Sequence, residues 1–348
     1  MQTVILDSNP INCKTTIIDE PSTVNKSNRI QEKNYLELVS NIDQKLRKVF
    51  IGSKINQGAY NDIFTFGKSN RSNIDDKIVI RISNNKSTDT SKESEKKGAK
   101  IQYKLCSLCK NIGNIVDYGK IYSRNEDYYI IEKYGVSLKD VLESKPKYTN
   151  FRVVLTFMKE FLYTMHCIHT NNFSHLDIKP SNILLKHKLS LDGRPLDNLD
   201  FALIDFGGAK YFRSNNSRKI DGQMASPAFS PPEVIKGKFG KKSDTWAYGI
   251  VCYLVCIGKF FFDADAHLIF MGDNKKELRG KIEKAMDKLV NSVVPKNKSI
   301  VYIKEYFKPL SIDNLSLLKD FFLKVFEPDI KKRPRCTELM KHPIFKHI

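Results

Sequence analysis

The stretch Phe173–Leu185 is the feature that most narrows what this chain can fold into. It sets polar side chains at fixed offsets, and an apolar run, Ile-Leu-Leu, follows them directly. These side chains are His175, Asp177, Lys179 and Asn182. A short apolar run bounded by polar residues predicts a strand, so we expect these side chains on the loop that leads into it. A carboxylate, an ammonium and an amide are thus held close together by local sequence alone.

These groups match the needs of phosphoryl transfer. A carboxylate can accept the proton of an attacking hydroxyl, a cation can lie beside the moving phosphate, and an amide oxygen can bind Mg²⁺. A His-x-Asp loop with a downstream Asn also occurs in kinases of small molecules. The loop by itself therefore leaves the class of substrate open.

Four further segments narrow the choice. Leu203–Gly208 is an apolar run that ends in Asp-Phe-Gly, and Ser226–Glu233 ends in Ser-Pro-Pro-Glu. Ser243–Gly249 and Arg333–Pro343 come later in the chain. In this order, and together with Phe173–Leu185, the segments resemble five motifs of eukaryotic protein kinases. They correspond to the catalytic loop, the Asp-Phe-Gly motif, the end of the activation segment, a buried helix and a C-terminal Arg-Pro pattern.

This resemblance implies an α+β, two-lobed fold, with a small antiparallel-sheet lobe that carries one helix and a larger helical lobe. The implied boundaries are an N-terminal extension at 1–49 and a kinase domain at 50–348, divided into N-lobe 50–131, hinge 132–135 and C-lobe 136–348. The implied activity is that of a Ser/Thr protein kinase with ATP and Mg²⁺ as cofactors and protein hydroxyls as acceptors. Two short segments resemble the casein-kinase-one and vaccinia-related branch, but the C-terminal pattern is the ordinary one, so the subfamily stays open.

The resemblance assigns catalytic roles residue by residue. Asp177 is the expected base that orients and deprotonates the acceptor hydroxyl, and Lys179 is expected to steady the γ-phosphate. Asn182 and Asp205 are the expected Mg²⁺ ligands. Lys179 favours Ser/Thr over Tyr as the acceptor, and Ser226 is expected to bridge the catalytic Asp and Lys.

Nucleotide binding is assigned to the N-lobe and the hinge. Ile55, Gly58 and Ile63 mark the expected phosphate-covering loop, which keeps one glycine of the usual pattern and has Asn at the flanking positions. Asn tolerates left-handed backbone angles, so the turn can survive. The backbone groups of Glu132 and Tyr134 are expected to bind the adenine edge.

Arg81 is the main departure from the family pattern. The run Ile-Val-Ile-Arg aligns with Val-Ala-Ile-Lys and places Arg where the phosphate-binding Lys belongs. Arg keeps the charge but replaces a compact ammonium with a planar fork. Glu95 is the predicted partner of Arg81, with Glu93 as the reserve. Two hypotheses follow: Arg81 performs the role of the Lys, or the protein is a pseudokinase scaffold with weak or no transfer.

A second departure is Leu176, which replaces the Arg that binds an activation-segment phosphate in the family. Leu cannot bind phosphate, so activity is expected not to depend on activation-loop phosphorylation through this contact. His175 is expected to support the loop rather than to carry protons. Glu233 and Arg333 are expected to form a buried ion pair.

Local patterns predict the other elements. Apolar residues at roughly helical spacing predict an amphipathic helix over Ile30–Val49. Short β-rich runs dominate Phe50–Glu132, with one helix at about 93–110. Helices are also predicted over Phe151–Thr170 and Lys275–Val290.

The seven cysteines indicate no paired framework. Cys106 and Cys109 form a C-x-x-C, but no second pair lies at zinc-ligand spacing. They stand at helical spacing beside Leu105 and Leu108, so the prediction is reduced thiols in the core.

Composition adds few constraints. The chain has 348 residues and a net charge of +19, which favours acidic partners, but its Lys residues are spread along the whole length. Nucleic acid is therefore left open as a partner without being indicated, and protein substrates and a monomer are expected. The N-terminus lacks a signal-peptide pattern and the longest apolar stretch is too short to cross a bilayer, so we expect no membrane association and a soluble, intracellular, cytoplasmic protein. The abundance of Asn, Ile and Lys would suit an AT-rich genome, such as that of a large DNA virus, acting in its host cell, or a protist.

Overall fold

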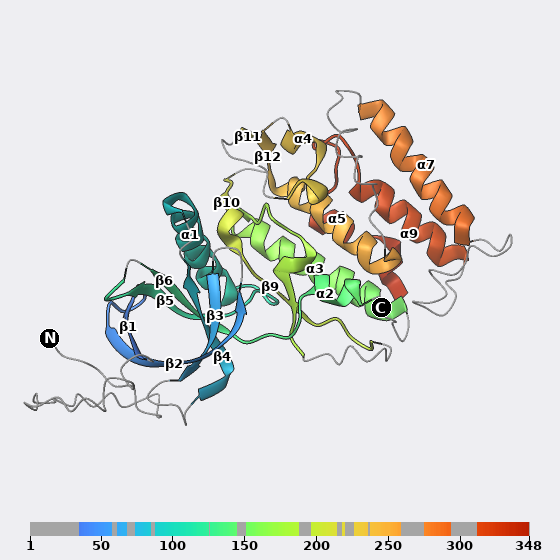
Figure 1. Cartoon of the computed structure of the whole chain (residues 1–348). Helices are drawn as coiled ribbons and strands as arrows, with labels where there is room; N and C mark the ends of the chain where they lie inside the picture. The colour runs from blue at the N-terminus through green and yellow to red at the C-terminus, as the bar shows by residue number, and fades with distance from the viewer. Residues whose placement is uncertain are drawn as a thin grey trace, which may run out of the picture. The chain divides into compact units, whose positions relative to one another are not determined.

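The computed structural model divides into two compact units, which are shown in Figure 1. It describes residues 35–57, 61–67, 74–84, 88–124, 126–144, 151–187, 196–213, 218–219, 226–235, 237–258, 275–293 and 312–347. The first unit ends at Lys133 and the second continues from Tyr134, with the short segment Leu108–Ile112 belonging to the second unit. Residues 1–34 of the predicted extension and the turn at Gly58 lie outside the described residues.

The described residues of the first unit form a closed antiparallel barrel with one helix. Its strands are β1 (Tyr35–Ser40), β2 (Leu46–Gln57), β3 (Asn61–Gly67), β4 (Ile74–Ser83), β5 (Ile115–Ile121) and β6 (Asp127–Glu132). They pair in the order β1-β2-β3-β4-β6-β5, and β1 closes the ring by pairing with β5. The helix α1 (Asp89–Cys106) begins and ends earlier than the predicted 93–110.

The helix predicted over Ile30–Val49 is wrong where the structure describes this segment. Residues 35–40 form β1, in which buried and half-buried residues alternate, and Leu36 and Leu38 face the core. A period of two is the signature of a strand with one buried face. Gly119 lets β1 approach β5, because a Cβ at this position would lie 2.0 Å from the carbonyl oxygen of Val39. The sheet thus begins before the predicted domain start at residue 50.

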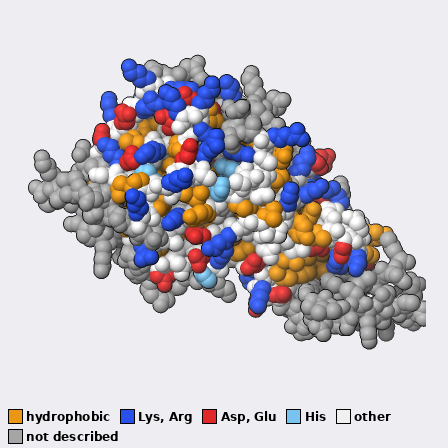
Figure 2. All heavy atoms as spheres, turned by 180° about the vertical axis from the view of Figure 1, so that it is seen from behind, with side chains coloured by type: hydrophobic (Ala, Val, Ile, Leu, Met, Phe, Trp, Pro, Cys, Tyr) orange, Lys and Arg blue, Asp and Glu red, His pale blue; other side chains and the backbone are white. Residues whose placement is uncertain are grey.

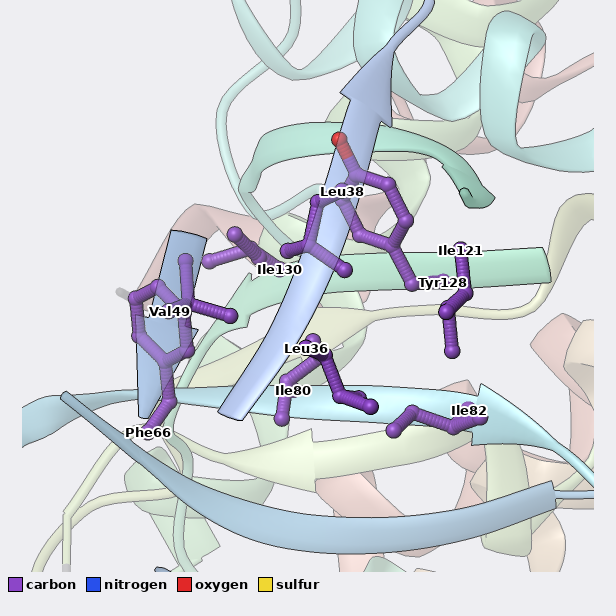
Figure 3. Close-up of a cluster of buried hydrophobic side chains, with 9 residues drawn as sticks. All are labelled: Leu36, Leu38, Val49, Phe66, Ile80, Ile82, Ile121, Tyr128 and Ile130. Carbon is purple, nitrogen blue, oxygen red and sulfur yellow. The ribbon is translucent and has the colours of Figure 1, made fainter. Parts of the chain in front are cut away.

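The interior of the barrel is an aliphatic core with one polar handle (Figure 3). Leu38, Ile80 and Tyr128 are completely buried in it. The Tyr128 hydroxyl donates to Asp117 over 2.9 Å. The polar end of this buried side chain therefore has a hydrogen-bond partner. On the outside, α1 packs through Ala99 against β5 and β6.

The second unit is mainly helical. Its described helices are α2 (Leu138–Glu143), α3 (Phe151–Thr170), α4 (Pro232–Ile235), α5 (Lys241–Ile257), α7 (Lys275–Val293), α9 (Ile312–Val325) and α10 (Cys336–Leu339). Its short strands pair as β7 (Phe173–Ser174) with β10 (Lys210–Tyr211), β8 (Ile183–Leu185) with β9 (Phe201–Leu203), and β11 (Arg218–Lys219) with β12 (Lys238–Phe239). The helices predicted over Phe151–Thr170 and Lys275–Val290 are confirmed, as is the mixed α+β fold.

The core of the second unit forms around α5, which is buried along nearly its whole length. A helix that is apolar on all sides is the pattern of a central helix rather than a surface one. Tyr248 packs edge-on against Phe161 of α3, and its hydroxyl donates to the Met158 carbonyl over 3.0 Å. The helix therefore gives a rigid base to the loops at its N-terminal end.

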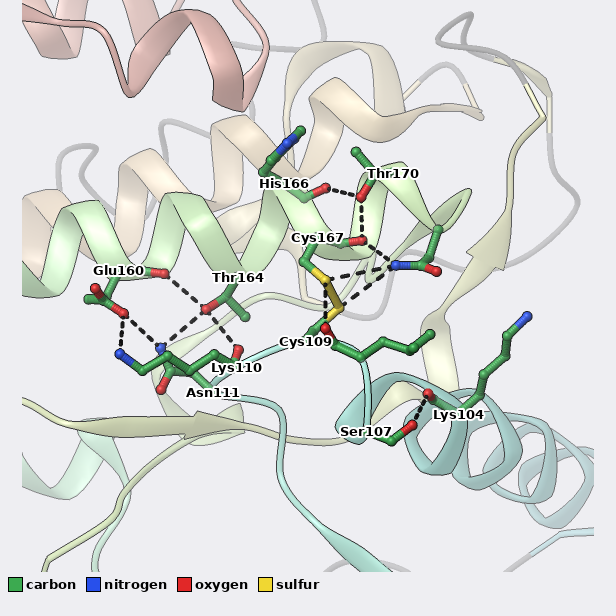
Figure 4. Close-up of a disulfide and its surroundings, with 12 residues drawn as sticks. Lys104, Ser107, Cys109, Lys110, Asn111, Glu160, Thr164, His166, Cys167 and Thr170 are labelled. Carbon is green, nitrogen blue, oxygen red and sulfur yellow. Dashed lines mark hydrogen bonds and ion pairs between the residues drawn. A yellow bond between two sulfur atoms is a disulfide. The ribbon is translucent and has the colours of Figure 1, made fainter.

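The prediction of reduced thiols is wrong for Cys109, which forms a disulfide with Cys167 of α3 (Figure 4). The pairing could not be read from local spacing, since the two residues are 58 positions apart. Cys106, the other member of the C-x-x-C, remains free. The salt bridge from Lys110 to Glu160 (3.0 Å) ties the same segment to α3. These bonds explain why the segment from 108 to 112 groups with the second unit.

The surface carries mixed charge. Figure 2 shows Lys and Arg side chains spread over one face, with Asp and Glu among them. This distribution agrees with the sequence, in which the basic residues form no single tract. Among the described residues, no helix is both long enough and apolar enough to cross a membrane.

Candidate active site

The catalytic-loop residues converge on the Asp177 carboxylate. Lys179 Nζ lies 2.7 Å from Oδ2 of Asp177, and Asn182 Nδ2 donates to the same oxygen over 3.0 Å. Asn182 Nδ2 also donates to the Asp177 backbone carbonyl over 2.9 Å, which closes the loop on itself. The loop lies between β7 and β8, so the strand predicted after the polar residues is formed.

Ser226 occupies the other side of this carboxylate. Its Oγ donates to Asp177 Oδ1 over 2.8 Å and accepts from Lys179 Nζ over 3.1 Å. The carboxylate, the ammonium and the hydroxyl thus form a closed triangle. Asp177 is only 8% exposed, so this triangle fixes the direction in which its oxygens point.

The loop backbone is held from below by Asp244 of α5. Asp244 accepts from the amide of His175 over 2.9 Å and from the amide of Leu176 over 2.8 Å. These bonds hold Leu176 in the left-handed region, with φ of 62°, which is unfavourable for a bulky side chain. His169 Nε2 lies 2.9 Å from the same carboxylate. A completely buried residue therefore stabilises the strained point of the catalytic loop.

His175 has a supporting position, as predicted. Its ring is completely buried and packs on Phe206, with centroids 4.6 Å apart. Nδ1 accepts from the Asp177 amide over 3.3 Å, so Nε2 is the atom that donates to the Ile204 carbonyl, 3.0 Å away. The histidine thus joins the catalytic loop to Ile204, the residue between β9 and Asp205.

Asp205 follows β9, which pairs with β8 so that Ile183 lies opposite Leu203. Asp205 has φ of 66° and accepts from the amide of Gly207 over 3.4 Å. The amide of Ile204 donates to the Asn182 carbonyl over 2.9 Å. This bond links the backbone next to Asp205 to that of Asn182, the other expected metal ligand. The Asn182 nitrogen is bonded to Asp177, so its side-chain oxygen is the atom that suits a cation. An amide oxygen and a carboxylate are donors that Mg²⁺ prefers.

The predicted pair between Glu233 and Arg333 is confirmed. Arg333 is completely buried and binds both carboxylate oxygens, with Nη1 2.7 Å from Oε1 and Nη2 2.9 Å from Oε2. Its other donors reach the backbone carbonyls of Glu327 and Lys242, each over 2.9 Å. Four of the five N–H groups of the guanidinium are therefore bonded, and its charge is paired, as a buried charge requires.

In the first unit, Arg81 pairs with Glu95, whose Oε1 lies 3.3 Å from Nη2. Asn61 Nδ2 donates to the same oxygen over 2.8 Å, and the guanidinium lies over the Tyr129 ring at 5.7 Å. Glu93, the reserve, instead forms an exposed pair with Lys97. The helix glutamate that pairs with the strand cation is therefore Glu95.

The other predicted nucleotide residues that the structure describes lie on β2, on β3 or at the unit boundary. Ile63 of β3 is the register partner of Arg81 and is half-buried, whereas Ile55 of β2 is exposed. The Glu132 amide donates to the Asn114 carbonyl over 3.1 Å. Tyr134 is the first residue of the continued second unit.

Comparison with known proteins gives the family. The protein kinase domain model matches residues 51–345. The chain belongs to the protein kinase domain family. Its relatives include calcium-dependent protein kinase 5 of Plasmodium falciparum, which is 24% identical over 238 residues that cover 67% of this chain and 35% of the relative. They also include smooth muscle myosin light chain kinase of Gallus gallus, 28% identical over 193 residues (55% of this chain and 8% of the relative). The probable serine/threonine-protein kinase HSL1 of Saccharomyces cerevisiae is 27% identical over 237 residues (67% and 13%).

The match covers both the strand that carries Arg81 and the loop that carries Asp177. The aligned regions span about a third or less of these relatives' own lengths, so the kinase domain is what the chain shares with them. Ser226, which the resemblance predicts as the bridge between the catalytic Asp and Lys, makes both contacts in the structure.

Proposed function

We propose that this kinase domain is an active Ser/Thr protein kinase that transfers the γ-phosphoryl group of ATP to protein hydroxyls. The observation that carries the proposal is the triangle of Asp177, Lys179 and Ser226, with distances of 2.7, 2.8 and 3.1 Å. A carboxylate fixed at both oxygens by its neighbours is oriented before an acceptor arrives. Such preorganisation is the main means by which proteins assist phosphoryl transfer.

In this proposal Asp177 receives the acceptor hydroxyl and takes its proton as the hydroxyl oxygen bonds to the γ-phosphorus and the bond from that phosphorus to the leaving ADP breaks. Lys179 stands beside the same carboxylate oxygen and offers positive charge to the transferred group. Asn182 and Asp205 would hold Mg²⁺, which supplies charge neutralisation at the phosphates when bound. The remaining ligands of the ion would be water and phosphate oxygens, as is usual for Mg²⁺.

Arg81 takes the role of the phosphate-binding lysine. Its charge is held by Glu95, and the ring of Tyr129 and the amide of Asn61 fix the geometry of the pair. A guanidinium can bind phosphate oxygens in place of an ammonium, and its planar fork makes the hydrogen bonds more directional. The substitution therefore changes how phosphate is held without removing the cation.

The test is transfer of labelled phosphate from ATP with Mg²⁺ to a generic protein substrate, followed by analysis of the phosphorylated amino acid. Asp177→Asn is expected to lower kcat by about a thousandfold, since it removes the base but keeps the shape. Asp76→Asn changes an exposed Asp in the first unit and is the matched control, expected to leave kcat unchanged. The proposal would be contradicted if the folded parent protein transferred no phosphate to several substrates. It would also be contradicted if phosphate were transferred to Tyr alone.

A further inference from the structure

A strongly basic cavity of about 310 Å³ lies within the second unit. It is lined by the end of α3, the start of α5, the region around α10 and one residue after β10. Its basic lining residues are His166, His169, Arg213, Lys241, Lys242 and Arg335. His166 and the neighbouring Thr170 are visible on α3 in Figure 4.

The basic side chains of this cavity share its lining with no carboxylate, although Glu338 and Asp329 act on Lys242 from outside the lining. The lining contains no Asp or Glu, and its other members are Thr, Asn and Cys. In the part of the chain that the structure describes, neither arginine forms an ion pair, and the two lysines bind only neutral oxygens. Lys241 Nζ donates to the Asn172 side chain over 3.1 Å, and Lys242 Nζ donates to the Lys331 carbonyl over 2.9 Å. The buried carboxylate of Asp244, on the same helix as Lys241 and Lys242, is bonded to His169 and two loop amides.

Lys241 is a side chain for which this grouping of positive charges has a free-energy cost. The residue is 7% exposed, and its ammonium has room for more hydrogen bonds than the one to Asn172. Burial lowers the pKa of Lys241, and the like charge of Arg335 lowers it further. A buried cation surrounded by other cations is stabilised by an anion that it can contact directly.

A second, independent feature also indicates a ligand. Thr245 lines the same cavity one turn after Lys241, and its hydroxyl is buried without a hydrogen-bond partner among the described residues. Buried hydroxyl groups in folded proteins are nearly always bonded. A bound oxygen-rich group, or water held with it, would satisfy this hydroxyl.

We propose that this cavity is a binding site for a dianionic phosphoryl group. Arginine forks and lysine ammonium groups together are the side chains that bind phosphate most strongly. The N-terminal end of the 17-residue helix α5 adds its partial positive charge. A volume of about 310 Å³ accepts a phosphate with the side chain that carries it, so a phosphoserine side chain and free phosphate are the two sources to be distinguished.

The position of the cavity connects it to the catalytic loop. Lys241 is one turn before Asp244, whose carboxylate holds the amides of His175 and Leu176. His169 contacts both the cavity and the support of the catalytic loop, since it lines the cavity and its Nε2 lies 2.9 Å from Asp244. Binding itself does not depend on the proposed kinase activity, so the two proposals can fail separately.

The test is calorimetric titration of the full chain, without nucleotide, with three probes: inorganic phosphate, a phosphoserine peptide and the same peptide with serine. Saturable binding of inorganic phosphate and the phosphopeptide, but not of the serine peptide, is expected. If the phosphopeptide binds and inorganic phosphate does not, the site recognises a phosphoserine side chain. If both bind equally, the phosphoryl group alone is recognised. Either result supports the site, whereas equal binding of the serine peptide or no binding overturns it.

Variants locate the site. Arg213 and Arg335 are both exposed, so the double change Arg213→Gln/Arg335→Gln should fold normally and weaken binding by about tenfold or more. Lys241→Met is the sharper variant, with folding checked by its melting curve. The control Lys284→Gln/Lys346→Gln removes the same charge from exposed positions elsewhere in the second unit and should bind like the parent. Equal weakening in the control would mean that net charge alone attracts the anion, which would overturn the proposal.

Discussion

Arg81 and Glu95 form an ion pair within the first unit, with Nη2 of the arginine 3.3 Å from Oε1 of the glutamate. The two side chains are 25% and 13% exposed, so water screens the pair only in part. Asn61 donates to the same carboxylate oxygen, which fixes the glutamate in place. The first unit therefore presents a guanidinium at the position where other kinase domains are expected to present an ammonium.

This pair predicts unequal effects of two substitutions at one position. Arg81→Lys keeps a cation beside Glu95 and is expected to retain most of the phosphotransfer, whereas Arg81→Met is expected to lower kcat/KM by about a hundredfold. Steady-state kinetics with varied ATP measures both. Arg124→Met, which changes a mainly exposed arginine of the same unit, is the control. If Arg81→Met kept the parent kcat/KM, Arg81 would have no part in binding phosphate.

The buried pair of Arg333 and Glu233 predicts a large effect on stability. Arg333→Met leaves the carboxylate buried without its cation and is expected to lower the free energy of unfolding by about 3 to 5 kcal/mol. Chemical denaturation followed by fluorescence measures the change. Arg335→Met, two residues away and exposed, should cost at most about 0.5 kcal/mol. Equal losses in the two variants would show that the buried pair contributes nothing beyond an ordinary surface arginine.

The disulfide predicts a separate effect of reductant. Closing a loop between residues 58 positions apart restricts the unfolded chain, so reduction of Cys109 and Cys167 is expected to lower the free energy of unfolding by about 2 to 4 kcal/mol. Denaturation with and without reductant measures the difference, and mass spectrometry of unreduced peptides should find the two cysteines joined. Cys109→Ser should remove the response to reductant, and Cys106→Ser should keep it. A parent protein that responds no more than Cys109→Ser would refute the bond.

The catalytic loop was predictable because its chemistry is local in sequence. Asp177, Lys179 and Asn182 lie within six positions, and their spacing alone brings a carboxylate, a cation and an amide together. Ser226 and Asp205 come from distant segments, and only the resemblance to the kinase family assigned them to the same place. The pairing of Arg81 with Glu95 rather than Glu93 needed the rotational phase of α1, which its sparse apolar residues do not fix.

The misassigned features depend on contacts between distant segments. The apolar residues from Ile30 to Val49 fit a helical period as well as a strand period, and only pairing with β5 and β2 selects the strand. Cys109 lies in the turn after α1 and its partner is on α3, 58 positions later, so no local spacing could show the pairing. The basic cavity likewise gathers Arg213, Lys241 and Arg335 from three segments that are far apart in the sequence.

The contact between His169 and Asp244 predicts a dependence of stability on pH. Burial by itself lowers the pKa of His169, but the nearby sulfur of Cys336 and the bond to Asp244 outweigh it and raise the pKa to about 9, against an ordinary value of 6.5. A raised pKa in the folded state means that the charged histidine stabilises the fold fully below pH 6.5, and that this contribution is lost as the pH rises to about 9. The difference in unfolding free energy between the parent and His169→Gln should therefore be largest near pH 6 and should shrink between pH 6.5 and 9. Repeating the comparison with Cys336→Ala in both proteins separates the effect of the sulfur from that of the carboxylate. A difference that stays constant over this range would show that His169 does not change its charge there.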